Sequence, residues 1–440
     1  MKQWTAVLSF TPAQIDAGYL VLKGNAPITD LPADGITYEK GQGLTASKVI
    51  YNGAATFVPV KEMLENSTYH FAVFAYNGNG ANINYKQTNP LTGTLSTPAA
   101  DAGNYYSAID SASGNLVAAL TALINPHSLQ SYTPGYANNV IPNLFERDTT
   151  GNQKVINCEY TNETTLYVPP FSFSSQQYNR EHVLCKSWMK TYPTYGANIT
   201  NQPEGADYFN LLLTKATPNQ VRSNNPLGIV LNASQTFGLA KYGTDNFGNT
   251  VFEPQNIRKG DAARAMFYEM ICYDGKNGSW GLDYLLAQGT QQDVNILKLW
   301  HQQDPPDKFE RTKNELFYSL QNNRNPFIDH PGWVNCINFD SLIKTAQCGF
   351  MTNVEELEET EWNVFPNPTS GTLHIQVANL DLNYLRVINT YGVEVFATHL
   401  ASANLQVELP ALSTGMYLLT VTDTLGKQTL RRSILIHRNE

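Results

Sequence analysis

The sequence predicts a multidomain protein in which a central α+β region lies between two all-β, sandwich-like regions. Its 440 residues suit two to four domains of ordinary size. Both ends of the chain carry short alternating runs between clusters of Gly, Pro and Asn, which is the pattern of β-strands, whereas the middle carries apolar residues at helical spacing. We place the regions at residues 1–99, 100–350, 351–362 and 363–440, the third being an acidic linker.

Residues 1–99 are predicted to form a β-sandwich. The strand candidates alternate in side-chain size and are bounded by turn-forming residues. They are Ala17–Leu22, Lys48–Tyr51, Thr56–Val60 and Tyr69–Tyr76. The runs Gly18–Leu22 and Tyr69–Asn77 resemble the later strands of a fibronectin type III domain, with the early strands short or missing. We find no catalytic constellation here and expect a spacer or binding module.

The middle region contains two helical patterns and one helix start. Apolar residues recur at three- and four-residue spacing within residues 104–125 and again within residues 252–273. Thr217 is predicted to be an N-cap, with Pro218 at the first helical position. That helix would carry Asn219 in its first turn and Arg222 one turn later on the same face.

The stretch 178–189 contains the clearest candidate site. Glu181 and His182 stand side by side, with basic residues at Arg180 and Lys186. Successive side chains of a strand point to opposite faces, so the pair can serve one site only where the strand ends or bulges and another element closes over it. The alternative is a histidine satisfied in the core beside a solvated glutamate.

The acidic composition limits how this protein can bind nucleic acid. The formal net charge is −9, with 15% charged and 42% hydrophobic residues. A polyanion would therefore have to be bound through a local basic patch or a metal ion, because the whole chain does not attract it.

Cysteine spacing and the chain start bear on the cellular compartment. The cysteines are Cys158, Cys185, Cys272, Cys336 and Cys348. They form no CxxC pair, which argues against a zinc ribbon, and Cys336 and Cys348 are candidates for a disulfide. No run approaches the roughly 20 apolar residues of a membrane span. The first residues lack a signal peptide, so we expect either a protein that stays inside or a chain without its true start.

Residues 363–440 return to a β pattern. The cues are Phe365–Pro368, Leu385–Asn389 and Gly415–Val421, with turn-forming residues between them. This unit resembles the C-terminal sorting domain of type IX secretion. The resemblance implies that the type IX machinery exports the protein across a Gram-negative outer membrane, which makes it a secreted or cell-surface protein.

Four sequence blocks follow one another in the middle region. The blocks are Asn179–Val183; Asp207 with Asn210-Leu211, then Asn219 and Arg222–Asn224; Glu253-Pro254 with Lys259–Arg264; and Gln321 with Asn325–Phe327. In order and spacing they resemble the bacterial endonuclease I family of secreted, non-specific nucleases. The resemblance covers roughly residues 104–335.

The resemblance implies a ββα-metal site, in which a strand brings Glu and His, and a helix brings Asn, to one divalent ion. Carried over, it assigns Glu181 and Asn219 as metal ligands and His182 as the general base. Carboxylate and amide oxygens suit Mg²⁺, with Ca²⁺ or Mn²⁺ as alternatives. Three basic residues are candidates for phosphate contact, and each could equally be paired with a carboxylate inside the protein. They are Arg222, Lys259 and Arg264.

The chain departs from the family pattern at three places. Phe209 stands where the family usually has a histidine, Leu184-Cys185 replaces Trp-Pro, and Pro218 precedes Asn219 in place of valine. None of these changes removes a proposed metal ligand or the proposed base.

Two functional hypotheses follow. The first is a secreted, metal-dependent, sequence-non-specific endonuclease that cleaves DNA, and RNA as well. The second is a surface-displayed binding or adhesion protein with an inactivated nuclease core. Retention of Glu181, His182 and Asn219 favours the first, whereas Phe209 and the net negative charge favour the second. A third, less favoured reading is a different phosphodiesterase that uses the same site architecture.

Overall fold

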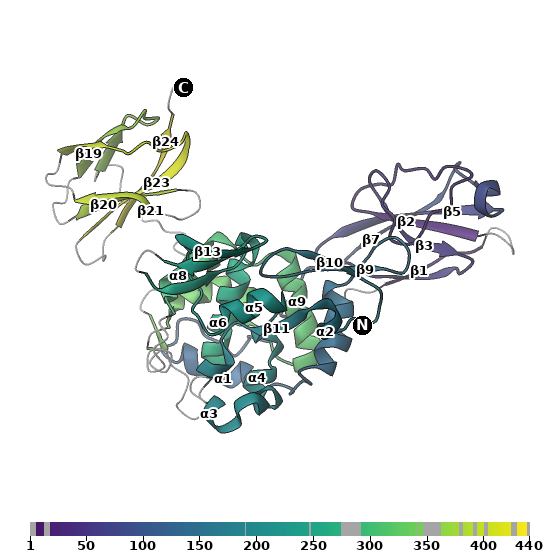
Figure 1. Cartoon of the computed structure of the whole chain (residues 1–440), viewed down its shortest axis with the longest axis horizontal. Coiled ribbons are helices and arrows are strands. Elements are labelled where there is room, and N and C mark those ends of the chain that lie inside the picture. The colour runs from purple at the N-terminus through teal and green to yellow at the C-terminus, as the bar shows by residue number, and fades with distance from the viewer. Residues whose placement is uncertain are drawn as a thin grey trace. The chain divides into compact units, whose positions relative to one another are not determined.

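The computed structural model of this chain divides into two compact units, Met1–Gly349 and Phe350–Glu440, shown in Figure 1. The described residues are 6–12, 18–189, 191–245, 248–273, 292–339, 341–345, 362–377, 382–389, 394–399, 404–423 and 429–437. None of the helices among them is both long and apolar enough to span a bilayer.

The first unit begins with a set of antiparallel strands. They are β1 (Ala6–Ser9), β2 (Gly18–Gly24), β3 (Lys48–Gly53), β4 (Phe57–Val60), β5 (Thr68–Asn77), β6 (Asn84–Tyr85) and β7 (Leu91–Ser96). One sheet has the order β3-β2-β5-β6 with β7 also on β5, and β1 pairs with β4. Strand β2 is buried on both faces, with Leu20 and Leu22 in one apolar cluster and Tyr19 and Val21 in another.

The strands expected in residues 1–99 are confirmed. Each of the four predicted runs overlaps one of β2, β3, β4 and β5. The alternation that indicated them is explained by the packing, because successive residues of β2 enter different clusters. The fibronectin type III assignment itself stays a prediction.

A buried carboxylate connects this β-region to the middle of the chain. Glu65, only 2% exposed, lies in the loop between β4 and β5. Its side chain accepts hydrogen bonds from Arg311 Nε at 2.8 Å and from the Ala100 N–H at 3.0 Å. Its own N–H donates to Thr312 Oγ1 at 3.1 Å. Arg311 and Thr312 belong to helix α9 (Lys308–Gln321), so the loop lies directly on that helix.

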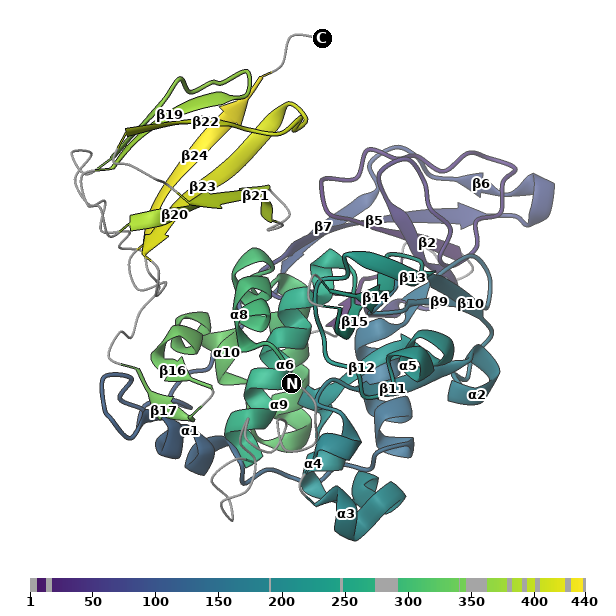
Figure 2. The same ribbon diagram turned by 60° about the vertical axis from the view of Figure 1, so that its left-hand side comes forward.

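The middle region is built around helix α6 (Lys259–Tyr273), every residue of which is buried. Helices α1 (Leu116–Ile124), α8 (Val294–Gln303) and α10 (Pro326–Asp329) pack against it, and Figure 2 shows α6, α8 and α9 grouped together. The helical patterns expected within residues 104–125 and 252–273 are confirmed. Side-chain caps start the later helices, since Asp293 caps α8, Asp307 caps α9 and Asn325 caps α10.

Short strands and turns complete the middle region. The strands are β8 (Arg147–Asp148), β9 (Lys154–Asn157), β10 (Thr164–Tyr167), β13 (Asn232–Phe237), β14 (Ala240–Thr244), β15 (Thr250–Glu253), β16 (Ile337–Asn338) and β17 (Ile343–Lys344). The short helices are α2 (Phe173–Gln176), α3 (Tyr192–Tyr195) and α4 (Pro203–Ala206), and a π-helix covers Tyr136–Phe145. Cys336 is disulfide-bonded, and Cys348, its expected partner, lies outside the described residues.

Two strands and a helix carry the predicted site residues. Strand β11 (Tyr178–His182) pairs antiparallel with β12 (Leu211–Lys215), and helix α5 (Ala216–Arg222) follows β12 without a loop, so the three elements lie together in Figure 2.

The predicted N-cap at Thr217 is wrong, because helix α5 already begins at Ala216. The Ala216 N–H still bonds to Gln177 O, at the end of the ladder, and Lys215 holds the cap position without a side-chain cap bond. Pro218 is tolerated because the first turn of a helix has no use for its N–H.

The second unit is a pair of antiparallel sheets. One has the order β18 (Trp362–Phe365), β19 (Thr372–Val377) and β22 (Asn404–Glu408). The other has the order β21 (Glu394–His399), β20 (Leu382–Asn389), β23 (Gly415–Asp423) and β24 (Thr429–Ile436). Leu373 and Ile375 of the first sheet share an apolar core with Leu385, Val387 and Leu419 of the second. The predicted acidic linker at 351–362 lies outside the described residues except for Trp362.

Replacing Arg311 by alanine is expected to lower the free energy of unfolding by about 1–3 kcal/mol, because the buried Glu65 carboxylate loses a charged donor. Urea unfolding of the full chain, followed by tryptophan fluorescence, measures the change. Lys241→Ala is the control, since Lys241 is exposed on β14 and should shift stability by less than about 0.5 kcal/mol. A loss in Arg311→Ala no larger than in this control would contradict the interface.

Candidate active site

Glu181 is held at the end of β11 with one carboxylate oxygen engaged and the other open. Its Oε1 accepts hydrogen bonds from Arg222 Nη1 at 2.8 Å and from the Tyr160 hydroxyl at 3.1 Å. Oε2 makes no hydrogen bond to any described residue. Burial raises the pKa of Glu181 to about 7, although the adjacent Arg222 cation acts in the opposite direction. Arg222 and Tyr160 thus orient the Glu181 carboxylate through Oε1, and Oε2 has no partner in the described part of the chain.

His182 is buried and fixed in orientation. Its Nε2 lies 2.8 Å from Gly205 O, and its ring stacks on Tyr132 with 5.4 Å between centroids and an interplanar angle of 22°. A carbonyl can only accept, so Nε2 carries the hydrogen and Nδ1 has the lone pair. Burial, with a smaller effect of the cations Lys186, Arg180 and Arg222, lowers the pKa of His182 to about 3, although the bond to Gly205 acts in the opposite direction. The imidazole is therefore neutral at physiological pH.

Arg222 joins the last turn of α5 to the end of β11. Besides its bond to Glu181, its guanidinium donates from Nη1 to His182 O at 2.9 Å and from Nη2 to Val183 O at 2.7 Å. The residue is fully buried. Arg222 therefore attaches α5 to the end of β11 through the Glu181 side chain and two main-chain carbonyls, whereas the His182 side chain has other partners, Gly205 and Tyr132.

Asn219 lies one turn before Arg222 on the same helix, which places both side chains on one side of α5. It is half-buried, and its amide makes no hydrogen bond to any described residue. Helix α5 packs against both β11 and β12. The structure thus brings the helix that carries Asn219 onto the strand that carries Glu181 and His182.

The basic residues predicted to contact phosphate are engaged inside the protein. Lys259 Nζ lies 2.5 Å from Glu253 Oε1. Arg264 pairs with Glu310, with Nε to Oε1 at 2.8 Å, and with Asp261 at 3.2 Å. Together with the Arg222–Glu181 pair, these contacts favour the structural alternative for all three residues, and their phosphate contact stays a prediction.

Three partners of the site were missed by sequence reasoning. Tyr160 bonds to Glu181, Tyr132 stacks on His182, and Gly205 accepts from the imidazole. Each lies about 20 to 50 positions away along the chain, and none carries a local sequence signal that would connect it to the site.

Phe209, which replaces an expected histidine, belongs to an aromatic core. Its ring centroid lies 4.8 Å from that of Tyr268 and 5.2 Å from that of Phe317. It is 3% exposed and makes no contact that requires a polar ring. The substitution is thus accommodated by packing.

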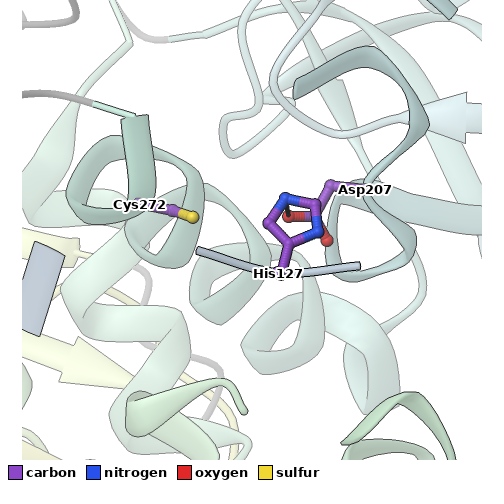
Figure 3. Close-up of side chains that lie close together, drawn as sticks. All are labelled: His127, Asp207 and Cys272. Carbon is purple, nitrogen blue, oxygen red and sulfur yellow. Dashed lines mark ion pairs between the residues drawn. The ribbon is translucent and has the colours of Figure 1, made fainter. Parts of the chain in front are cut away.

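A second buried cluster lies around Asp207, as Figure 3 shows. Potential ligand atoms of His127, Asp207 and Cys272 lie within 4.8 Å of one another, which is close enough for these residue types to hold a metal ion. However, Asp207 Oδ2 already accepts hydrogen bonds from the hydroxyls of Tyr268 and Tyr273, each at 2.7 Å. The His127 ring nitrogen Nε2 lies 2.7 Å from the same Tyr273 hydroxyl.

The remaining groups of this cluster are engaged within the protein as well. The Cys272 thiol donates to Ile124 O at 3.7 Å and lies 3.5 Å from the Tyr268 hydroxyl. Asp207 Oδ1 is engaged as well, by Gln321 Nε2 at 2.9 Å and the Phe209 N–H at 3.0 Å. The cluster is best described as a hydrogen-bond network that connects α6, α9 and the turn before β12.

Comparisons with known proteins identify the family of the middle region. Residues 112–332 match the family model described as Endonuclease I. The extracellular ribonucleases of Bacillus amyloliquefaciens and Bacillus subtilis (strain 168) are each 30% identical to this chain, over 246 and 245 residues respectively. Each match covers 54% of this chain and 79% of the relative.

Residues 363–436 match the model of the secretion system C-terminal sorting domain. The protein is therefore secreted or located at the cell surface, through the type IX system. The Endonuclease I model matches half of this chain, and the chain therefore belongs to the Endonuclease I family.

Proposed function

We propose that this protein is a metal-dependent, sequence-non-specific endonuclease that hydrolyses phosphodiester bonds of DNA and RNA. The single observation that carries the proposal is the neutral His182 with its Nδ1 lone pair, adjacent along β11 to a Glu181 carboxylate whose Oε2 has no hydrogen bond to a described residue. The alternative, a displayed binding or adhesion protein with an inactivated core, would not need these groups to be preserved and oriented.

The donor set fits a hard divalent cation such as Mg²⁺, with Ca²⁺ or Mn²⁺ as alternatives. Glu181 Oε2 and the side-chain amide of Asn219 are both without hydrogen bonds among the described residues, and both offer oxygen. When bound, such an ion supplies charge stabilisation at the phosphate and at the leaving oxygen. Arg222 and Tyr160 both donate to Oε1, which leaves Oε2 as the ligand atom.

His182 is placed to accept a proton from the attacking water at Nδ1. The bond from Nε2–H to Gly205 O fixes the tautomer and the ring plane, and the Tyr132 ring covers one face. Such general-base catalysis contributes about 10²–10⁴-fold in rate. The protein thus holds a neutral base in one orientation at the end of β11.

Replacing His182 by alanine is expected to reduce nicking of supercoiled plasmid by about 10²-fold or more, because the proton acceptor is lost. Gel assays with Mg²⁺ and with EDTA, repeated on a single-stranded RNA, measure the change and the metal requirement. His70→Ala, in β5 of the N-terminal region, is the matched control and should keep wild-type activity. Absence of nicking by the wild type with every divalent ion would refute the nuclease proposal.

Replacing Asn219 by alanine is expected to raise the Mg²⁺ concentration for half-maximal activity by about tenfold or more, because one oxygen ligand is removed. Isothermal titration with Mg²⁺ provides a readout that does not depend on activity. The melting temperature should be unchanged, since the amide makes no hydrogen bond to any described residue. Unaltered Mg²⁺ affinity in this variant would exclude Asn219 as a ligand.

A further inference from the structure

Arg180 occupies an unusual position beside His182. The two residues are separated by one position on β11, so their side chains leave the strand on the same face. The Arg180 guanidinium lies between two aromatic rings, 4.1 Å from the centroid of Tyr132 and 4.0 Å from that of Phe173. Tyr132 is the same ring that stacks on the His182 imidazole. Base and guanidinium are therefore neighbours across one shared aromatic ring.

Arg180 also has no carboxylate partner among the residues that the structure describes, unlike comparable arginines. In the described part of the nuclease region, the buried Arg222, Arg264 and Arg324 each form an ion pair with a carboxylate. Arg180 forms none, and its Nε and Nη1 are buried without a hydrogen-bond partner among those residues. A guanidinium with unpaired buried donors is costly, which indicates that an anion completes the site when substrate is present.

The surrounding charges favour such an anion. Lys186, in the turn that follows β11, is half-buried and forms no ion pair with a described residue. Arg180 lies on the Tyr132 ring that also stacks on His182, and Lys186 follows His182 by four positions along the chain. These two cations, which have no carboxylate partner among the described residues, add local positive charge to a chain whose net charge is −9.

We propose that Arg180 is the phosphate-binding arginine of this site and that its guanidinium contacts the nucleic-acid phosphate next to His182. The inference rests on the proposed nuclease function and names the residue that positions its substrate. All the N–H donors of a guanidinium lie in its plane, so the Tyr132 and Phe173 rings can cover both faces and leave the edge for phosphate oxygens. Arg180 is only half-buried, so part of it stays open to solvent.

The test is the salt dependence of DNA binding by the full chain, measured without cleavage. A short fluorescein-labelled DNA duplex is titrated in EDTA at several KCl concentrations, and anisotropy gives the dissociation constant at each. Losing one phosphate contact should reduce the slope of log Kd against log [KCl] by about 1 in Arg180→Met. With Mg²⁺ added, plasmid nicking should fall about tenfold or more. Arg180→Lys keeps the charge without the planar fork, so it should keep the slope and lose nicking.

Arg147→Met is the matched control, because Arg147 is exposed and its side chain bonds, among the described residues, to Asn157 and to no carboxylate. This substitution also removes one positive charge, and it should change neither the slope of log Kd against log [KCl] nor plasmid nicking. A slope in Arg180→Met equal to that of the wild type, with only the melting temperature lowered, would overturn the proposal and make Arg180 a structural cation. If Arg180→Met fails to fold, Arg180→Gln gives the same measurement with a planar polar group.

The two proposals can fail separately. A wild type that never nicks plasmid, while Arg180→Met still loses slope, would refute the nuclease activity and keep the phosphate contact. Active wild type with an unchanged slope in Arg180→Met would keep the nuclease and refute the role of Arg180.

Discussion

The organisation of the site depends on one buried guanidinium. Arg222 donates to the Glu181 carboxylate and to the carbonyls of His182 and Val183, so a single side chain satisfies the end of β11 and attaches α5 to it. A buried charge of this kind needs acceptors at fixed positions, and Arg222 has them for both terminal nitrogens, although its Nε has no partner among the described residues. That requirement sets where the helix sits on the strand, and with it the position of Asn219 relative to Glu181. Substituting Arg222 would therefore disturb two proposed metal ligands at once, although it is not expected to contact metal.

Much of the fold could be predicted from the sequence because its signals are local. Alternation in β2 and β5 reflects a strand buried on two faces, and the apolar spacing within α6 reflects a helix surrounded on all sides. The start of α5 was misplaced because a sequence pattern cannot show that β12 runs into the helix without a loop. Sequence signals for an N-cap apply to a helix that follows a loop. Helix α5 instead follows directly on strand β12, whose last residue, Lys215, is still paired with β11.

The candidate site was predicted only in part, for a related reason. Glu181 and His182 are adjacent in sequence, and family resemblance added Asn219, but Tyr160, Tyr132 and Gly205 reach the site through tertiary folding. The sequence also could not show which basic residues are paired with a carboxylate. Arg264 and Lys259 have carboxylate partners in this structure, whereas Arg180, in the motif itself, has none within the described ranges. The sequence shows which residues are basic, and only the fold shows which of them remain uncompensated.

Helix α9 has a consequence for how this protein could be rearranged in evolution. Its first turns carry Lys308, Arg311 and Thr312, which bond to the N-terminal β-region, and its last residue, Gln321, bonds to the buried Asp207. One rigid element thus borders both the accessory region and the inner polar network of the catalytic region. A domain joined only by a flexible tether can be exchanged between genes without loss, whereas this one brings the buried Glu65 carboxylate into a shared boundary. Fusing the N-terminal region to another nuclease would therefore require that nuclease to carry the α9 residues that contact this region, Lys308, Arg311 and Thr312.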